Sequence, residues 1–401
     1  MMPVDFNRNP FIVVWEITRA CALHCVHCRA EAQHKRHPDE LSTEEGKRLL
    51  DEIQSMDSPI FVFTGGDPLL REDLFELAAY GKSIGLRVSM TPSATPRVTI
   101  DSMKKAAEIG LDRWAFSLDG STAAIHDRFR GASGSFELTM RSLKYLRELG
   151  MPLQINTTVC VHNKNDLPNI ANLLTEMGVV MWSVFFLVPT GRGKDDDMIS
   201  PEEGEEILHW LAELGERVPF GVKTTAAPFY RRVLDQRAKA AGQRPASVAG
   251  RMLGVPELAT ATGKHVAAAA VTGGSGHSHA QRSNSPFGAG DGKAAMRAPR
   301  GVTDGSGFVF ISHTGEISPS GFLPIVCGNV REEKLSDVYR NHPVFTSIRS
   351  PELYTGKCGV CDYSRMCGGS RARAYTATGD YMASDPACAY IPPAWQELLQ
   401  P

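Results

Sequence analysis

The sequence lacks a hydrophobic run long enough to cross a membrane. Its longest apolar stretch, residues 179–189, falls well short of the about 20 residues that a membrane-spanning helix needs, and Ser183 interrupts it. The first residues do not place a basic segment before an apolar one, so no secretory signal peptide is expected. These absences favour a cytoplasmic protein with no membrane span.

The sequence also has little excess of charge of either sign. Its 401 residues carry a formal net charge of −2, and 22% charged with 42% hydrophobic residues is usual for a globular protein. No basic patch or stripe marks a nucleic-acid footprint, so no nucleic-acid partner is expected. A chain of this length is sufficient for one large domain with a smaller one beside it.

Short apolar runs alternate with amphipathic stretches between about residues 10 and 225. A capping box at residues 42–45 predicts the start of the first helix. Strands that alternate with helices through short connections form a parallel sheet covered by helices, so the sequence predicts an α/β fold with a partial (β/α)6-type barrel. Functional loops of such folds lie at the carboxyl ends of the strands. Strands are predicted at 11–15, 59–63, 86–90, 114–117, 153–159, 181–188 and 220–224.

Composition divides the chain into three parts. Residues 1–230 hold the predicted barrel, and residues 231–306 begin as a helix and pass into a flexible connection rich in glycine, alanine and serine. Apolar patterning resumes after Gly307, so residues 307–401 are predicted to form a small cysteine-rich domain.

Three cysteines follow the first predicted strand. Nine cysteines in a chain without a signal peptide favour metal or redox chemistry over disulfides. The close spacing of Cys21, Cys25 and Cys28 predicts a loop folded round one metal centre, and thiolates suit an iron–sulfur cluster. A structural zinc site, with His24 or His27 as the fourth ligand, is the alternative.

A second array near the C-terminus has enough thiols for a closed site. On spacing alone, zinc and an iron–sulfur cluster explain it equally well. Cys327 is left over as a free buried thiol or a further ligand, and Cys160 is predicted to lie in the core. The four thiols of the array are Cys358, Cys361, Cys367 and Cys388.

The loop at Cys21 and the strand before it resemble the cluster loop of the radical S-adenosylmethionine (radical SAM) enzymes, over roughly residues 10–230. The resemblance implies a 4Fe-4S cluster on Cys21, Cys25 and Cys28, whose open iron binds S-adenosylmethionine (SAM). It also implies reductive cleavage of SAM to a 5′-deoxyadenosyl radical that abstracts hydrogen from substrate. A ferredoxin or flavodoxin would supply the electron.

The same resemblance indicates residues that contact SAM. His27 corresponds to the residue that packs near the adenine. Gly65, Gly66, Asp67 and Pro68 correspond to the family's Gly-Gly-Glu-Pro segment, whose backbone binds the methionyl ammonium. The glycines are expected to allow close backbone approach to that ligand, and a Gly-Gly turn with Asp-Pro starting a helix is also compatible with this segment.

Four further residues lie at strand ends or soon after them. Ser117 and Arg130 look like the family's carboxylate and ribose contacts, and Asp119 and Asn156 are weaker candidates. A serine at a strand end is also a common cap, and Arg130 is also compatible with a surface charge.

The second array resembles the outer auxiliary cluster of the C-terminal SPASM domain of radical SAM enzymes. The chain departs from the full pattern at Arg371, where a further ligand is expected, and at Ser318 and Ser320, where that family often has a Pro-Cys pair. We therefore expect one auxiliary 4Fe-4S cluster rather than two.

Three sequence strings, at residues 64–69, 92–96 and 187–192, look most like the haem and haem d1 maturation branch, which acts on tetrapyrrole propionates or acetates. The resemblance implies an oxidoreductase or lyase that oxidatively modifies or decarboxylates a tetrapyrrole. The first alternative function is modification of a ribosomally made peptide or protein. The second alternative is a non-enzymatic role, as an iron–sulfur or zinc scaffold or as an electron carrier. Lys223, Arg231 and Arg232 suit substrate carboxylates, although a solvated basic helix face is the favoured interpretation.

Metal content tests the two arrays. Anaerobically reconstituted protein is expected to bind about eight irons, the content of two cubane clusters. Iron and zinc analysis of the purified protein checks this, and two zincs without iron would contradict it.

Overall fold

The structure, a computed structural model, describes residues 5–242 and 301–400. Most of the predicted connection within residues 231–306 lies outside the described residues. The described strands are β1 (Ile12–Glu16), β2 (Ile60–Thr64), β3 (Arg87–Met90), β4 (Arg113–Ser117), β5 (Leu153–Val159), β6 (Met181–Phe186), β7 (Gly221–Thr225), β8 (Phe308–Ile311), β9 (Glu316–Ser318) and β10 (Gly328–Asn329).

Helices follow most of these strands. The α-helices are α1 (Thr43–Ser55), α2 (Leu74–Ser83), α3 (Ile100–Ile109), α4 (Ala123–Arg130), α5 (Ser135–Glu148), α6 (Leu167–Met177), α7 (Pro201–Leu214), α8 (Tyr230–Ala240), α10 (Leu335–Asn341), α11 (Pro343–Ile348), α12 (Gly356–Gly359), α13 (Arg371–Thr378) and α14 (Pro393–Leu398). Short 3-10 turns are η1 (Pro68–Leu70), η2 (Lys164–Asp166), η3 (Asp195–Asp197) and η4 (Pro351–Leu353).

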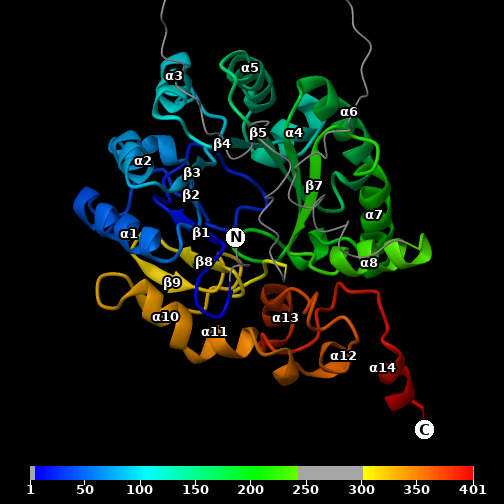
Figure 1. The fold of residues 1–401 in the computed structure, drawn as a ribbon. Coiled ribbons are helices and arrows are strands. Elements are labelled where there is room, and N and C mark those ends of the chain that lie inside the picture. Colours follow the sequence, from blue (N-terminus) through cyan, green and yellow to red (C-terminus); the bar gives the residue numbers. More distant parts are fainter. Residues whose placement is uncertain (1–4, 243–300, 401) are drawn as a thin grey trace, which may run out of the picture.

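The strands form one curved sheet in the order β10-β9-β8-β1-β2-β3-β4-β5-β6-β7, with the helices on its outer side (Figure 1). Strands β1 to β7 are parallel neighbours in chain order. This confirms the predicted α/β partial barrel, and each of the seven predicted strands is present with ends within two residues. The predicted capping box is present, since Ser42 and Glu45 exchange hydrogen bonds at the start of α1. Helix α4 (Ala123–Arg130), which Gly131 caps at its C-terminal end, was not predicted.

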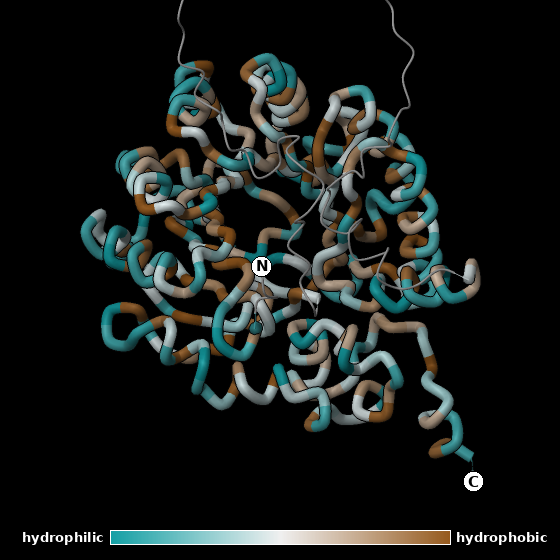
Figure 2. Tube along the Cα trace, in the orientation of Figure 1, coloured by the Kyte–Doolittle hydropathy of each residue, from teal (hydrophilic) through white to brown (hydrophobic). Residues whose placement is uncertain are grey.

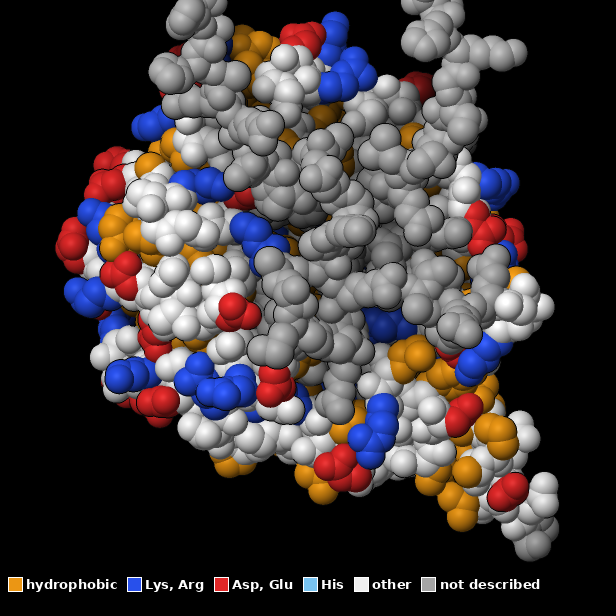
Figure 3. Space-filling view, in the orientation of Figure 1, with side chains coloured by type: hydrophobic (Ala, Val, Ile, Leu, Met, Phe, Trp, Pro, Cys, Tyr) orange, Lys and Arg blue, Asp and Glu red, His pale blue; other side chains and the backbone are white. Residues whose placement is uncertain are grey.

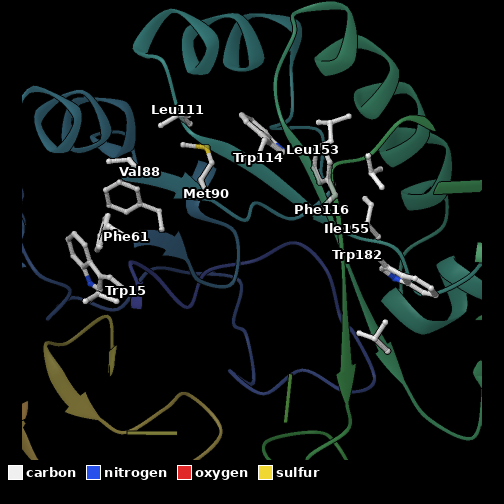
Figure 4. Packing of buried hydrophobic residues seen from close by; sticks show 14 of the residues in the cluster. Trp15, Phe61, Val88, Met90, Leu111, Trp114, Phe116, Leu153, Ile155 and Trp182 are labelled. Atoms are coloured by element: carbon white, nitrogen blue, oxygen red, sulfur yellow. The ribbon is translucent and has the colours of Figure 1, made fainter. Parts of the chain in front are cut away.

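The hydrophobic core lies between the sheet and the surrounding helices. Hydrophobic residues concentrate on the strands, and hydrophilic ones on the outer surfaces of the helices (Figure 2). Alternate residues of each strand enter this core, among them Trp15, Phe61, Trp114 and Trp182 (Figure 4). Because neighbouring residues of a strand point to opposite faces, the residues between them line the interior of the barrel.

The C-terminal segment continues the barrel sheet. Strand β8 pairs in parallel with β1, with Ile12 opposite Phe308, and β9 and β10 add antiparallel strands at that edge. At the other edge of the sheet, Arg373 of α13 donates hydrogen bonds to two backbone carbonyls. One is that of Phe186, the last residue of β6, at 3.3 Å, and the other is that of Ala226, just past β7, at 2.8 Å. The segment after residue 307 therefore spans from one edge of the curved sheet to the other.

The surface drawn in Figure 3 mixes charges of both signs. Acidic and basic side chains are interspersed over its left side, and hydrophobic side chains gather near α14, where Leu398 and Leu399 are exposed (Figure 3). Among the described helices, none combines the length and the apolar character that crossing a bilayer requires.

Arg373 provides a test of how the C-terminal segment is attached. It is 1% exposed and forms a 3.1 Å ion pair with Asp385, which is fully buried. Replacing it by leucine leaves the Asp385 charge buried without its partner, which typically costs about 3–5 kcal/mol. We expect Arg373→Leu to lower the free energy of unfolding in urea by about that amount, whereas Arg365→Leu, at an exposed position of the same segment, changes it little. Equal stability of the two variants would contradict this role.

Candidate cofactor site

The three clustered cysteines come together at the carboxyl end of β1. Cys21 and Cys25 are buried, Cys28 is half-buried, and the three pack in one small cluster. The backbone N–H of Leu23 donates to Cys21 Sγ at 3.3 Å, and that of Ala32 donates to Cys28 Sγ at 3.5 Å. Hydrogen bonds of this kind orient the sulfur ligands of metal centres.

Segments that follow other strands hold this loop in place. Arg192, after β6, donates its backbone N–H to the Cys28 carbonyl at 3.0 Å and its Nε to the Cys25 carbonyl at 2.9 Å. Gly191 has a φ of +61°, and a Cβ there would lie 2.4 Å from the Arg29 carbonyl oxygen. From the end of α4, Phe129 accepts from the Val26 N–H at 3.1 Å. The loop therefore takes its shape from distant parts of the barrel.

Arg130 places a positive charge beside one of the thiols. Its guanidinium donates to Cys25 Sγ at 3.6 Å and pairs with Asp119 at 2.6 Å. Asp119 is fully buried and also accepts from the Thr158 N–H at 2.7 Å. Burial alone would lower the pKa of Arg130, but Asp119 and Cys25 raise it above its ordinary value, so the guanidinium stays charged. The surface-charge interpretation of Arg130 is therefore wrong, and Asp119 contacts the loop through Arg130.

His27 lies in the cysteine loop, between Cys25 and Cys28. Its ring packs on Phe129 with a centroid distance of 4.4 Å. Burial, with the charges of Arg130 and Arg192 adding to it, holds the pKa of His27 well below its ordinary value, so the imidazole is neutral.

The Gly65–Gly66 pair approaches the chain's own backbone. A Cβ on Gly65 would lie 2.5 Å from the Thr18 carbonyl oxygen, and one on Gly66 would lie 2.4 Å from that of Ala20. The N–H groups of Gly66 and Asp67 donate to these two carbonyls at 2.8 and 2.7 Å. The structure thus shows a further reason for the glycines, which is close approach to the segment leading into the cysteine loop.

Asp67 and Pro68 form the turn after β2. Asp67 is fully buried, accepts from the Leu69 N–H and from the Thr95 hydroxyl, and caps η1, which begins at Pro68. Burial raises the pKa of Asp67. The side chain thereby joins the loop after β2 to the loop after β3, which carries Ser93 to within 3.5 Å of Cys21 Sγ.

Ser117 and Asn156 are direct neighbours across two strands. Their Cα atoms are paired in the register of β4 and β5, and both residues are half-buried on the inner face of the sheet. The Asn156 side-chain oxygen accepts from Gln154 at 2.8 Å. These two residues thus share one row across the barrel interior.

Glu16 is a buried residue of the site that the sequence analysis missed. It ends β1, is fully buried, and pairs with Arg29, with Arg19 at 3.1 Å and with His313 at 3.3 Å. Burial would raise the pKa of this carboxyl, but Arg29, His313 and Arg19 together lower it to about 2. The sequence signal that could have identified Glu16 is its place at the end of a strand, directly before a loop that contains two arginines.

The four C-terminal thiols line one small pocket with Lys357, Tyr363 and Tyr390. Burial raises the pKa of Cys367 to about 12 and that of Cys388 to about 11. Arg371, buried in α13, donates to Cys358 Sγ at 3.7 Å and to the carbonyls of Tyr381 and Ala383. The residue at the position expected for a further ligand is thus a cation that contacts a thiol.

The other two cysteines are core residues. Cys160 packs with Phe129 and Leu187, as predicted. Cys327 is buried in the main core, where burial raises its pKa to about 12.

The basic residues near β7 have separate environments. Arg232 is buried and pairs with Glu205 at 2.5 Å, and Arg231 donates to the carbonyls of Val302 and Met366. Lys223 lies on β7 itself. The interpretation as a solvated basic helix face is therefore wrong.

Both thiol arrays fit iron–sulfur clusters. In residues 5–242 and 301–400, no three His, Cys, Asp or Glu side chains converge closely enough to hold one metal ion. Cubane clusters take their thiolates on different irons, so their ligands need not converge on one point. Beside the first array, His27 Nδ1 and Arg192 Nη2 are buried without a hydrogen-bond partner among the described residues, so both atoms are available to a bound cofactor. In the second array, buried thiols with raised pKa values require the positive charge of a metal to become thiolates.

A parallel partial barrel with a three-thiol loop at the end of its first strand defines an α/β enzyme with a cofactor site at the strand ends. A family model described as the radical SAM superfamily matches residues 15–174. The chain is 40% identical over 383 residues to the AdoMet-dependent heme synthase of Nitratidesulfovibrio vulgaris, covering 95% of this chain and 92% of that protein. It is 28% identical over 402 residues to the Fe-coproporphyrin III synthase of Methanosarcina barkeri, covering 95% and 88%.

The chain belongs to the radical SAM superfamily. The chain is therefore an enzyme, and the cofactors of its family are a 4Fe-4S cluster and SAM. The crystal structure of Streptococcus suis SuiB bound to S-adenosylmethionine has the same fold, with a TM-score of 0.64 at 14% identity, covering 96% of this chain and 78% of that one.

Glu16 makes the stability of the site depend on pH. Its pKa of about 2 lies below the ordinary value of 4.5, so the ionised carboxylate stabilises the fold above about pH 4.5 and loses this effect as the pH falls towards 2. At pH 7 the shift corresponds to about 3 kcal/mol. We expect Glu16→Gln to unfold at lower urea concentration at pH 7 and to lose less stability than the wild type on acidification.

The free energy of unfolding, measured between pH 7 and pH 3, checks this. Glu352→Gln, at an exposed acid, is the matched control and is expected to follow the wild type. Parallel pH profiles for Glu16→Gln and the wild type would contradict the assignment.

Proposed function

We propose that this chain is a haem-maturation enzyme that oxidatively modifies or decarboxylates a tetrapyrrole bearing carboxylate side chains. The observation that carries this proposal is the 40% identity, over almost the full length of both chains, to a protein named AdoMet-dependent heme synthase. The similarity to Fe-coproporphyrin III synthase supports the same substrate class.

In this proposal, Cys21, Cys25 and Cys28 hold the SAM-binding cluster. When bound, the cluster and SAM supply the radical chemistry, in which one electron cleaves the sulfonium and a hydrogen atom is removed from substrate. Arg130 gives the Cys25 ligand a hydrogen bond from a cation, and such charge-assisted bonds are stronger than neutral ones.

The predicted SAM contacts take two roles. Direct contacts with SAM are assigned in this proposal to His27, Gly65, Gly66, Ser117 and Asn156. The ring of His27 is neutral and suited to stacking. Asp67, Pro68, Asp119 and Arg130 have positioning roles in this proposal. Asp67 and Pro68 form the turn after β2, and Asp119 and Arg130 pair with each other beside the cysteine loop.

The four C-terminal thiols hold one auxiliary 4Fe-4S cluster in this proposal, in a SPASM-type segment that begins near residue 307 and follows a barrel of residues 1–230. Such a cluster can accept the electron that a substrate oxidation releases. A ferredoxin or flavodoxin in the cytoplasm supplies the electron that starts the reaction.

Substrate-stimulated cleavage of SAM tests the substrate class. Reconstituted enzyme with a chemical reductant and SAM is expected to form 5′-deoxyadenosine faster with iron coproporphyrin III than without it, and the porphyrin is expected to be altered in mass. Stimulation by a ribosomally made peptide and not by porphyrin would contradict the proposal.

A single cysteine replacement tests the cluster assignment. Cys25→Ala is expected to abolish 5′-deoxyadenosine formation, since the cluster loses one of three ligands, while the absorption and electron paramagnetic resonance signals of the C-terminal cluster persist. Cys160→Ala, at a buried thiol outside both arrays, is the control and is expected to keep SAM cleavage. Formation of 5′-deoxyadenosine by Cys25→Ala would show that the assignment is wrong.

A further inference from the structure

Lys223 faces the interior of the barrel. Its neighbour Val222 is paired with Trp182, and both enter the hydrophobic core on the outer side of the sheet. Lys223 is paired with Ser183 in the same register, so both point to the opposite, inner face.

A continuous row joins this lysine to Asn156 and Ser117, which the proposed function assigns to SAM binding. Across four parallel strands, Ser117 is paired with Asn156, Asn156 with Ser183, and Ser183 with Lys223. Strands of a sheet are about 5 Å apart, so the backbone of Lys223 lies roughly 10 Å from that of Asn156. A substrate that fills the barrel interior next to SAM would therefore reach Lys223.

The ammonium of Lys223 is not neutralised by the protein. Among the described residues no acid faces Lys223, and the one charged group that acts on it is the guanidinium of Arg113 of β4. Burial and the charge of Arg113 lower the pKa of Lys223 to about 8. A partly buried ammonium is costly without an anion beside it, so an anion bound next to Lys223 would be stabilised.

The carboxylates at the strand ends are already engaged. Glu16 binds its two arginines and His313, Asp119 binds Arg130, and Asp67 is held by Thr95 and by backbone N–H groups. These three described carboxylates are thus engaged elsewhere, which leaves a bound molecule as a source of the anion that matches Lys223. Around it, Ser183 and Thr225, whose hydroxyls are 3.3 Å apart, add further hydrogen-bonding groups.

We propose that Lys223, with the hydroxyl of Ser183, forms a subsite that binds a carboxylate side chain of the substrate inside the barrel. This inference rests on the proposed function, since a tetrapyrrole with propionates supplies such a group. The subsite anchors a carboxylate of the substrate and so determines which edge of the ring faces the radical-forming site.

Binding of matched probes to the reconstituted enzyme with SAM tests the subsite. The probes are iron coproporphyrin III and its methyl ester, which has the same ring without charged carboxylates, and dissociation constants are measured by absorbance titration. The wild type is expected to bind the free acid at least tenfold more tightly than the ester. Because hydrogen bonds to charged groups contribute more than neutral ones, Lys223→Gln is expected to weaken binding of the acid by about tenfold or more and leave the ester unchanged.

Two further variants complete the test. Lys223→Arg keeps the positive charge and is expected to retain most of the preference for the acid. Lys144→Gln, at an exposed lysine of α5, is the matched control and is expected to bind both probes as the wild type does. Binding of the ester by Lys223→Gln serves as the check that this variant is folded.

The failure of this subsite is distinguishable from failure of the proposed function. Equal weakening of acid and ester in Lys223→Gln, unchanged binding of both, or no preference for the acid in the wild type would overturn the subsite and leave the tetrapyrrole proposal standing. Failure of the wild type to bind either probe would overturn the proposed substrate class and the subsite with it.

Discussion

The arrangement of the site depends on the buried carboxylate of Glu16. It lies at the end of the first strand and binds Arg19 and Arg29, which stand on either side of the cysteine loop, and His313 after β8. A buried carboxylate is costly unless positive groups offset its lost solvation, so these groups are held together round it. One side chain thereby couples the first strand, the loop with three thiols and the C-terminal edge of the sheet.

Positive charge also accompanies both thiol arrays. Arg130, which is half-buried, donates to Cys25, and Arg371, which is buried, donates to Cys358. Hydrogen bonds to the sulfur ligands of a metal centre orient those ligands. The same sign of charge continues into the barrel interior at Lys223, where no protein acid among the described residues balances it.

Local patterns of the sequence predicted most of the fold. Alternating apolar runs located the seven parallel strands, and the capping box of Ser42 and Glu45 located the first helix, because these signals depend on residues close together in the chain. Predictions about contacts succeeded less well. The closeness of Gly66 to Ala20, and the pairing of Arg232 with Glu205, join residues far apart in sequence, and no local pattern indicated either.

The sequence by itself determined that three thiols follow the first strand, that parallel strands bring their carboxyl ends to one edge, and that four more thiols form a second array. Only the tertiary structure decided that Arg130 meets Cys25, although 105 residues separate them. It also decided that the segment after residue 307 continues the barrel sheet and that Lys223 points into the barrel. The physical reason is register: the pairing of strands sets which distant side chains share a row, and helix and strand periodicity carries no information about it.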